Sequence, residues 1–549
     1  MIPQPVLATT ASLPVDIRRF PWIKPLAADY AFAYERLGDF FAGDPHSSDA
    51  WRAAIVRAQG AASARDRVVD VVAAQQEHRQ APAASRAALQ TLRDSRTVAV
   101  LTGQQAGVFG GPLFTLLKAL TAIRLAEQVR TEHGVSTVAV FWIDAEDHDW
   151  DEVKSCGVLD GDLVPHTVSV GDPAGAHERP VARVILDATI DTAIAELERL
   201  LTPTEFTPAL LGSLRSAYRQ GLGTAEAFGR WLESVLGDRG LIVYDASDPA
   251  AKPLVGHIFA RELEHAGETA RAAAAAGDAL QERGYHAQLT PHNDTVALFH
   301  LDGGREPIRS DSDGFRVGSV RHDRAALIEQ ARTNPEAFSP NVMLRPIVQD
   351  TIFPTICYVA GPNELAYLGQ LKAVYAAFDV PMPLMFQRLT ATLVDSNAMR
   401  FLTRHGFPLE QLQAQDEAAL NDLLASHLPP GVEASLEQAG RTLRERMETL
   451  AGQVPQIDPT LEGATRSTLG RMEDDLKKLH AKVIQAAKRK DETLRRQFKH
   501  AQAQAFPAGH PQEREIGFLY FLNRCGPPLI DRLSRELLLD MGTHWVITV

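Results

Sequence analysis

The sequence predicts an α/β fold with a doubly wound parallel sheet. Two apolar runs rich in β-branched residues, Val98 to Leu101 and Val138 to Ile143, enclose a segment with helical periodicity. Similar strand-like runs follow later in the chain, at 241–244, 356–359 and 383–386. Strands that alternate with helices favour a parallel sheet with helices on both faces. We expect the loops after these strands to meet at one edge of the sheet, where such folds bind ligands.

The first predicted strand runs into a glycine-rich segment, here called the glycine loop (Leu101 to Pro112). Glycines let the backbone approach a ligand closely, and the helix after Pro112 offers free N–H groups to an anion. The loop has neither the Gly-Lys-Ser/Thr of a Walker A motif nor a G-x-G-x-x-G fingerprint. Its glutamines can bind a polar ligand through donors and acceptors, although a tight turn capped by amides is the alternative. The candidate ligand-binding residues here are Gly103, Gln104, Gln105, Gly107 and Gly110.

The second predicted strand runs into a group of carboxylates around one histidine, here called the acidic loop (Asp144 to Asp149). Crowded like charges raise one another's pKa values and favour a nearby proton, cation or amine. A histidine between carboxylates suits general-base catalysis, such as removing a proton from an attacking amine. One or two carboxylates could instead hold Mg²⁺, and a solvated helix N-terminus is the simplest alternative. The candidate catalytic residues are Glu146, Asp147, His148 and Asp149.

Two later segments, 339–350 and 361–364, supply further polar residues close to predicted strand ends. Arg345 precedes a proline in an apolar stretch, where an arginine is rarely left unpaired. It could bind a carboxylate or phosphate of a ligand, or form a buried ion pair within the protein. The other candidate substrate-binding residues are Asn341, Gln349, Asp350, Asn363 and Glu364. Arg388, after the last core strand, and Arg514, in a polar insertion near the C-terminus, are candidates for binding a nucleotide.

The overall composition excludes several classes of protein. The 549 residues carry a net charge of −13 with a pI of about 5.8, which disfavours a general nucleic-acid or anionic-membrane binder. No apolar run approaches the roughly 18 residues of a membrane span, and no signal peptide is recognisable at the start. The three cysteines, Cys156, Cys357 and Cys525, lack the spacing of a metal site. We therefore expect a cytoplasmic protein without a metal bound by cysteines.

We expect the parallel core to be interrupted twice and followed by a helical arm. The predicted parts are a first core segment (1–159), an insertion (160–235), a second core segment (236–395) containing a small antiparallel meander (270–340), an antiparallel coiled-coil arm (396–504) and a C-terminal segment that packs back on the body (505–549). Near-heptad apolar spacing on both sides of Pro455 and Pro459 predicts the two arm helices. Such a hairpin buries its apolar seam poorly alone, so we expect a homodimer. The basic stretch Lys477 to Lys499 is more typical of a solvated helix face than of a nucleic-acid arm.

Five motifs occur in order across nearly the whole chain: TGQQAGVFGGP, VFWIDAEDHD, SPNVMLRPIVQD, YVAGPNELAYLGQLK and GHPQERE. Together they resemble the bacillithiol biosynthesis cysteine-adding enzyme family, BshC. The resemblance implies a Rossmann-type core related to class I synthetases, an inserted connective-peptide region and a coiled coil that forms a homodimer. It also implies the last step of bacillithiol synthesis, in which cysteine is joined to the amine of glucosaminyl-malate. The resemblance also implies an ADP site away from the main crevice. This chain lacks the His-x-Gly-His and Lys-rich loops of class I synthetases, so the relation by fold does not imply their ATP chemistry.

We therefore expect a ligase that forms an amide bond between cysteine and glucosaminyl-malate, with ATP as the energy source. The amine would lose its proton to His148, held by Asp147 or Asp149, and Arg345 would bind a carboxylate. The alternative is a non-catalytic scaffold subunit of the same pathway that binds a sugar-malate or a nucleotide, which the missing adenylation loops favour. A tRNA-binding relative of the synthetases is a third interpretation, supported only by the basic stretch.

Overall fold

The computed structural model describes residues 12–549 except 62–63, 302–303, 427–429 and 491. It divides into two compact units. The first comprises the chain up to Leu393 together with Gln512–Ile547 and Val549, and the second comprises Val394–Pro511 and Thr548. Among the described residues, no helix combines the length and the apolar character that crossing a bilayer would require.

A five-stranded, fully parallel sheet forms the centre of the first unit. Its order is β13 (Leu384–Gln387), β12 (Thr355–Ala360), β2 (Val98–Gln105), β3 (Thr137–Asp144) and β6 (Ile242–Asp245). Counted along the chain, this is the 3-2-1-4-5 order of a Rossmann-type doubly wound sheet, which confirms the predicted fold. The strand order reverses between β2 and β12. Ligands bind at such a switch point in doubly wound folds, outside the carboxyl ends of the strands.

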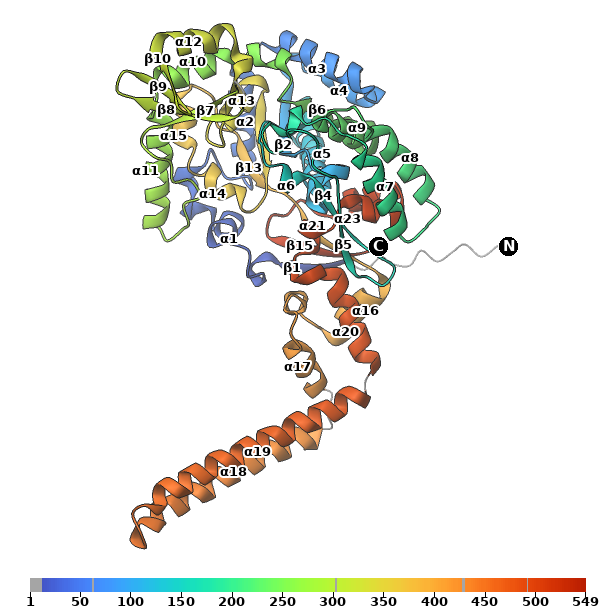
Figure 1. Ribbon diagram of the computed structural model, residues 1–549, viewed down its shortest axis with the longest axis vertical. Coiled ribbons are helices and arrows are strands. Elements are labelled where there is room, and N and C mark those ends of the chain that lie inside the picture. Colours follow the sequence, from blue (N-terminus) through green and yellow to red (C-terminus); the bar gives the residue numbers. More distant parts are fainter. Residues whose placement is uncertain (1–11, 62–63, 302–303, 427–429, 491) are drawn as a thin grey trace, which may run out of the picture. The chain divides into compact units, whose positions relative to one another are not determined.

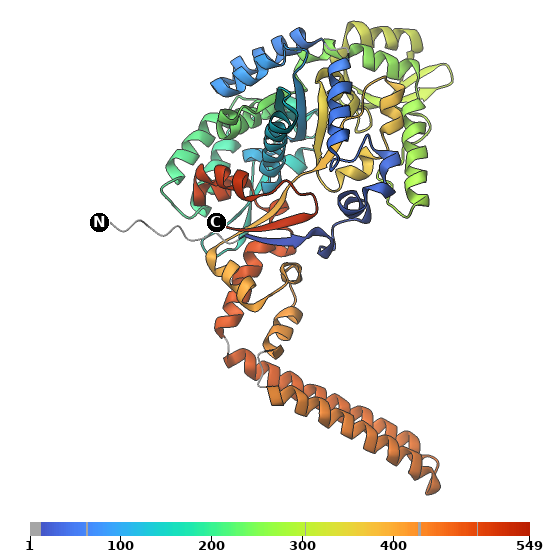
Figure 2. The same cartoon turned by 180° about the vertical axis from the view of Figure 1, so that it is seen from behind.

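Helices cover both faces of this sheet (Figure 1 and Figure 2). The crossover helix α5 (Leu113–His133) joins β2 to β3, and it contacts β2, β3 and β12. It begins directly after Pro112 and ends at Gly134, whose φ of 65° is readily adopted only by glycine. The predicted start and stop of this helix are therefore confirmed.

Two insertions extend the core near its carboxyl edge. The first contains an antiparallel hairpin of β4 (Ser155–Leu159) and β5 (Pro165–Ser169), followed by α7 (Thr189–Leu200), α8 (Thr207–Ala217) and α9 (Thr224–Leu236). The second contains the predicted antiparallel meander, in which β7 (Thr295–His300), β8 (Glu306–Asp311), β9 (Gly314–Val317) and β10 (Val320–Asp323) are joined by β11 (Phe338–Pro340).

The two ends of the first unit meet in a separate three-stranded sheet. There β15 (Thr543–Thr548) lies between β1 (Ser12–Asp16) and β14 (Thr390–Val394). The C-terminal helices α21 (Gln512–Glu515), α22 (Phe518–Cys525) and α23 (Pro528–Glu536) precede β15. A bridge between Pro112 and Gly517 connects them to the glycine loop.

The second unit is helical and contains the predicted antiparallel arm. Its long helices are α18 (Pro430–Gln453) and α19 (Leu461–Lys490), which run side by side (Figure 1). The turn between them contains Pro455, and Arg444 pairs with Glu473 across the two helices at 2.7 Å. At the base of the arm are α16 (Ser396–His405), α17 (Ala418–Ser426) and α20 (Glu492–Ala505).

Candidate functional site

A polar crevice lies at the carboxyl ends of β2, β3 and β12, at the switch point of the sheet. Its volume is about 240 Å³. Four of the segments singled out in the sequence converge here: the glycine loop, the acidic loop and the segments 339–350 and 361–364. The lining residues are Gly103, Gln104, Gln105, Asp144, Asp147, Arg305, Pro340, Asn341, Val342, Arg345, Tyr358, Glu364 and Tyr367.

Strand register positions the glutamines and the first carboxylate. Gln104 and Gln105 are the last residues of β2, and Gln105 pairs with Asp144 at the end of β3. Gly103 lies against Trp142 so closely that a Cβ would come within 3.0 Å of the Trp142 carbonyl oxygen. A side chain at this position would force the neighbouring β3 backbone to shift, so glycine suits the close approach of β2 to β3.

Arg345 is the first residue of α13 (Arg345–Ile352) and is 9% exposed. Its guanidinium donates to Gln349 Oε1 at 3.2 Å and to the Tyr367 hydroxyl at 3.3 Å. The Asp144 carboxylate lies 3.7 Å from Arg345 Nε, which is beyond hydrogen-bond distance. Gln349 and Tyr367 are neutral, and Asp144 is too far away for a hydrogen bond. The positive charge of the guanidinium is therefore available to a ligand carboxylate or phosphate.

The acidic side of the crevice consists of Asp144 and Asp147, whose side chains are 36% and 37% exposed. Burial raises the pKa of Asp144 above its ordinary value, and the charge of Arg345 offsets part of this shift. Asp147 lines the crevice from the same loop. A carboxyl group with a raised pKa beside a bound amine can accept the proton that the amine loses on attack.

The sequence did not predict two cationic residues of the site, Arg305 and Lys118. Arg305 reaches the crevice from the segment between β7 and β8, stacks on the Phe299 ring at 3.7 Å and lies 3.8 Å from Asp147 Oδ1. Lys118 lies beneath the crevice on α5 with 2% of its surface exposed. The one sequence signal for Lys118 was a lysine on an otherwise apolar helix face, and Arg305 gave none.

Lys118 connects the loops on the two sides of the switch point. Its ammonium donates to the Gly103 carbonyl at 2.8 Å, to Gln104 Oε1 at 3.1 Å and to Glu364 Oε1 at 3.0 Å. All three N–H donors are therefore used within the protein. Burial lowers the pKa of Lys118, and the charge of Glu364 acts against this shift.

The acidic loop does not direct all its side chains into the crevice. Asp147 lines it, but the His148 side chain is 56% exposed and does not, with Nδ1 3.6 Å from Asp147 Oδ1. Asp149 accepts a hydrogen bond from the Glu152 backbone N–H at 3.2 Å and caps a short helix. Glu146 is buried and forms an ion pair with Lys252. Of the four candidate catalytic residues, the structure thus places one in the crevice.

Gly110 is buried inside the protein, and Gly107 beside it is half-buried. The Gly110 N–H donates to the Tyr218 hydroxyl at 3.1 Å, and this hydroxyl donates to the Gly107 carbonyl at 3.2 Å. A Cβ on Gly110 would lie 2.4 Å from the Phe518 ring. Gly110 thus permits close packing of Phe518 from α22 and of Trp231 from α9, and its N–H already has an acceptor within the protein.

The remaining substrate-binding candidates divide into lining and supporting residues. Asn341 and Glu364 line the crevice. Gln349 and Asp350 are buried behind Arg345, and Asp350 accepts hydrogen bonds from the Tyr375 hydroxyl at 2.6 Å and from Gln349 Nε2 at 2.9 Å. Asn363 is exposed and does not line the crevice.

The two candidate nucleotide-binding arginines are in different situations. Arg388 is 3% exposed and forms a two-point ion pair with Glu513, at 3.0 and 2.7 Å. Arg514 is exposed and lies 5.9 Å from the centre of the Phe114 ring. The Arg388 guanidinium is thus already satisfied by a buried carboxylate, whereas that of Arg514 is accessible.

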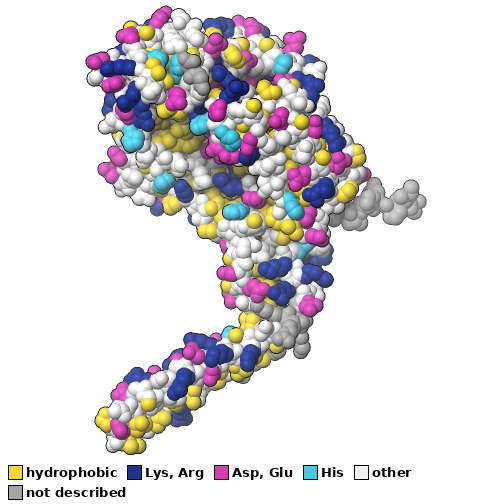
Figure 3. Space-filling view, viewed as in Figure 1, with side chains coloured by type: hydrophobic (Ala, Val, Ile, Leu, Met, Phe, Trp, Pro, Cys, Tyr) yellow, Lys and Arg dark blue, Asp and Glu magenta, His cyan; other side chains and the backbone are white. Residues whose placement is uncertain are grey.

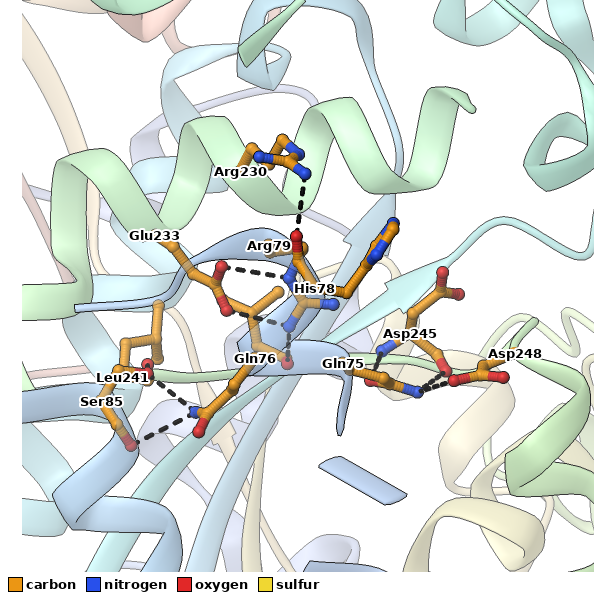
Figure 4. A network of polar contacts seen from close by, with 11 residues as sticks. Gln75, Gln76, His78, Arg79, Ser85, Arg230, Glu233, Leu241, Asp245 and Asp248 are labelled. Carbon is orange, nitrogen blue, oxygen red and sulfur yellow. Dashed lines mark hydrogen bonds and ion pairs between the residues drawn. The ribbon is translucent and has the colours of Figure 1, made fainter. Parts of the chain in front are cut away.

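A second, larger cavity of about 570 Å³ lies beyond the acidic loop, at the carboxyl end of β6. Glu146, Lys252, Asp245 and Asp248 are among its lining residues. Gln75 fixes this wall because its amide donates to the Asp245 carbonyl and to Asp248 Oδ2, both at 3.0 Å (Figure 4). The Glu146–Lys252 pair belongs to this cavity, so the acidic loop supplies side chains to both cavities.

One group of three close metal-ligand residues occurs among the described residues: Asp151, Asp172 and His177, all exposed. The Lys154 ammonium lies 2.6 Å from Asp151 and 3.0 Å from Asp172, so a cation is already present there. In the crevice, Asp144 and Asp147 each have an arginine nearby, at 3.7 and 3.8 Å. A Mg²⁺ ion at either carboxylate would compete with that arginine.

The fold and the crevice define a Rossmann-type protein that binds small polar molecules at a sheet switch point and carries a coiled-coil arm. Residues 13–389 match the family model described as the bacillithiol biosynthesis BshC N-terminal Rossmann-like domain, and residues 391–549 match the BshC C-terminal coiled-coil domain. The chain therefore belongs to the BshC family.

Curated relatives extend over nearly the same length. A protein of Salinibacter ruber is 34% identical over 98% of both chains, and one of Chlorobaculum tepidum is 33% identical over 86% of both. A protein of Geobacillus kaustophilus is 30% identical over 97% of this chain and 100% of its own. All three are named "Putative cysteine ligase BshC".

Proposed function

We propose that this protein is a ligase that joins the carboxylate of cysteine to the amine of glucosaminyl-malate, the last step of bacillithiol synthesis. The observation that carries the proposal is the crevice, in which Arg345 and Arg305 lie beside Asp144 and Asp147. This arrangement suits a substrate that carries both carboxylates and an amine. The names of the relatives support the activity class.

In this proposal the malate carboxylates contact Arg345 and Arg305, since guanidinium groups bind carboxylates through two parallel hydrogen bonds. The amides of Gln104, Gln105 and Asn341 face the same space and would contact the sugar hydroxyls. Neutral amides can both donate to and accept from hydroxyl groups, so they suit a sugar ring without adding charge.

The amine must be neutral when it attacks the activated carboxyl carbon of cysteine. We assign the proton transfer to Asp147, with Asp144 beside it, because these carboxylates line the crevice and His148 does not. The nitrogen forms the new bond to carbon, its proton passes to the carboxylate, and the activating group leaves with the former carboxyl oxygen.

A free carboxylate must be activated before it forms an amide, and ATP is the proposed energy source. The glycine loop does not fit a phosphate cradle, because the Gly110 N–H is bound to Tyr218 and Phe518 occupies the space beside Gly110. We therefore assign no ATP phosphate to Gly107 or Gly110. The exposed Arg514 is a proposed nucleotide contact, whereas Arg388 is bound to Glu513.

We also propose that the arm forms a homodimer. Large apolar side chains stay exposed on the arm, and hydrophobic side chains gather near its tip (Figure 3). They are Leu450, Ile457, Leu461, Met472 and Leu479. Apolar surface of this kind on a two-helix hairpin is typical of a protein interface.

The test is to incubate the purified protein with cysteine, glucosaminyl-malate and ATP, and to measure the coupled product by mass spectrometry. The ligase proposal expects product together with ADP or AMP, whose identity distinguishes activation by phosphorylation from adenylation. The closed glycine loop and the exposed His148 favour a second candidate, a non-catalytic subunit that binds the sugar-malate. If the protein has that function, calorimetry should detect binding of glucosaminyl-malate, and the incubation should yield neither coupled product nor hydrolysed nucleotide.

A further inference from the structure

Arg345 is held from behind by two later residues of its own helix, Gln349 and Asp350. Gln349 lies one helical turn after Arg345, and its Oε1 accepts a hydrogen bond from the guanidinium at 3.2 Å. The other end of the same amide, Nε2, donates to Asp350 Oδ1 at 2.9 Å. Gln349 and Asp350 are 1% and 8% exposed, and neither belongs to the crevice lining. They can therefore act on a ligand only through Arg345.

The Gln349 amide has a donor end and an acceptor end, and only the acceptor end can receive the guanidinium. A reversed amide would place its NH₂ group against the N–H donors of Arg345. An ionised Asp350 carboxylate accepts hydrogen bonds and donates none, so it binds the NH₂ end and leaves Oε1 for Arg345. Within the part of the chain that the structure describes, the amide has these two partners alone. Asp350 therefore decides which end faces Arg345.

The Asp350 carboxylate is fixed in turn from a separate helix. The hydroxyl of Tyr375, on α15 (Lys372–Ala377), donates to Asp350 Oδ2 at 2.6 Å, so the two carboxylate oxygens have different partners. Burial raises the pKa of Asp350 to about 6, and the hydrogen bonds from Tyr375 and Gln349 act against this shift. The carboxyl group is thus mainly ionised at neutral pH, and in that state it only accepts hydrogen bonds.

We propose that Asp350 is a positioning residue for substrate binding, which orients the Gln349 amide so that the Arg345 guanidinium is held ready for a malate carboxylate. The inference rests on the proposed function, because it takes Arg345 as the residue that binds this carboxylate. A guanidinium binds a carboxylate through two parallel hydrogen bonds, so affinity depends on its orientation. A neutral amide suits this task, since it holds the guanidinium without neutralising the charge that attracts the substrate.

The experiment compares Asp350→Asn with Tyr375→Phe by calorimetric titration of the full chain with glucosaminyl-malate. Asp350→Asn offers the Gln349 amide a donor as well as an acceptor, so either end of that amide can face Arg345. Tyr375→Phe is the matched control, because it removes a hydrogen bond from the same carboxylate and leaves the contact of Oδ1 with Gln349 in place. Gln349→Met is a second variant, which removes the amide between Asp350 and Arg345 and changes neither of those residues.

We expect Asp350→Asn and Gln349→Met each to weaken binding by about tenfold, and Tyr375→Phe to stay within about twofold of the wild type. In the coupling reaction the first two variants should raise KM for glucosaminyl-malate and leave kcat within about threefold. Thermal melting of the three variants measures their stability separately. If Asp350 only supported the fold, affinity would follow the melting temperature, and Tyr375→Phe would weaken binding as much as Asp350→Asn.

The outcomes separate this inference from the proposed function. Unchanged affinity in Asp350→Asn, or an equal loss in Tyr375→Phe, would overturn the role of Asp350 even if Arg345→Met weakens binding. Should Asp350→Asn fail to fold, unchanged affinity in Gln349→Met would overturn it in the same way. Unchanged affinity in Arg345→Met, or a wild type that does not bind glucosaminyl-malate, would contradict the proposed substrate site and this inference together.

Discussion

Arg345 Nε and Asp144 Oδ2 lie 3.7 Å apart across the switch point of the parallel sheet. Asp144 ends β3, whereas Arg345 begins the helix that precedes β12, so the two charges come from the two halves of the core. The pair is close enough to offset part of the rise in the Asp144 pKa but too long for a hydrogen bond. A ligand carboxylate can therefore approach the arginine without breaking a tight ion pair.

Replacing Arg345 with Met should weaken binding of glucosaminyl-malate by about ten- to a hundredfold, because a charge-assisted hydrogen bond to a carboxylate is lost. Arg345→Lys keeps the charge but not the paired donors, and it should give an intermediate affinity. Calorimetry with the purified variants measures both effects. Arg446→Met, on the exposed arm, is the control. Unchanged affinity in Arg345→Met would remove this residue from the substrate site.

We expect substitutions of Asp147 and His148 to have opposite effects: the first should lower kcat strongly and the second should hardly change it. Asp147→Asn should lower kcat by about 10² to 10⁴, since the proposed proton acceptor of the crevice is lost. His148→Ala should leave kcat within about threefold, because the ring is 56% exposed and outside the crevice. Steady-state product formation measures both. The reverse ranking would restore His148 as the base.

Lys118 should matter for stability as well as for the shape of the site. Lys118→Met leaves Glu364 without its buried cation, and we expect about 3 kcal/mol lower stability in urea unfolding. The double variant Lys118→Met with Glu364→Gln should recover part of that loss, because no carboxylate is then left unpaired. A double variant no more stable than Lys118→Met alone would show that the pair does not carry the effect.

Glu262, which lies outside the crevice, should make the stability of the folded protein depend on pH. It is 1% exposed and accepts hydrogen bonds from Thr269 and the Ala297 N–H, and burial raises its pKa from 4.5 to about 7. Between these two values the folded protein binds more protons than the unfolded chain, so stability falls as the pH rises through this window. Compared with Glu262→Gln, the wild type should lose about 3 kcal/mol between pH 4.5 and 7.5. Parallel pH profiles of the two proteins would contradict this.

The arm residues test the proposed homodimer. Met472 and Leu479 are 43% and 50% exposed on the arm. Replacing both with Glu places charges in the proposed interface, so light scattering should then show a monomer instead of a dimer. Ser467→Glu adds a charge at an exposed polar position of the same helix and should leave the dimer intact. A monomeric wild type would contradict the proposal directly.

Much of the fold could be predicted because it rests on local patterns. The β2–α5–β3 unit follows from two apolar runs, Pro112 and Gly134, and the arm follows from near-heptad spacing. Gln104, Gln105 and Arg345 lie in the crevice because strand ends of a parallel sheet share one edge.

The rest of the site depends on contacts between distant segments. Arg305 comes close to Asp147 from the second insertion. Tyr218, from the first insertion, accepts the hydrogen bond of the Gly110 N–H. Lys118 belongs to an apolar helix face, where sequence periodicity alone does not reveal an ammonium group beneath the crevice. His148 was expected in the site because its neighbours are acidic, but sequence neighbours in a loop can point in different directions.

The most direct test is a crystal structure of the protein with glucosaminyl-malate bound. We expect a malate carboxylate within hydrogen-bond distance of Arg345 and the amine beside Asp147, inside the crevice at the ends of β2, β3 and β12. Glucosaminyl-malate bound instead in the larger cavity beside Asp245, with the crevice empty, would contradict it.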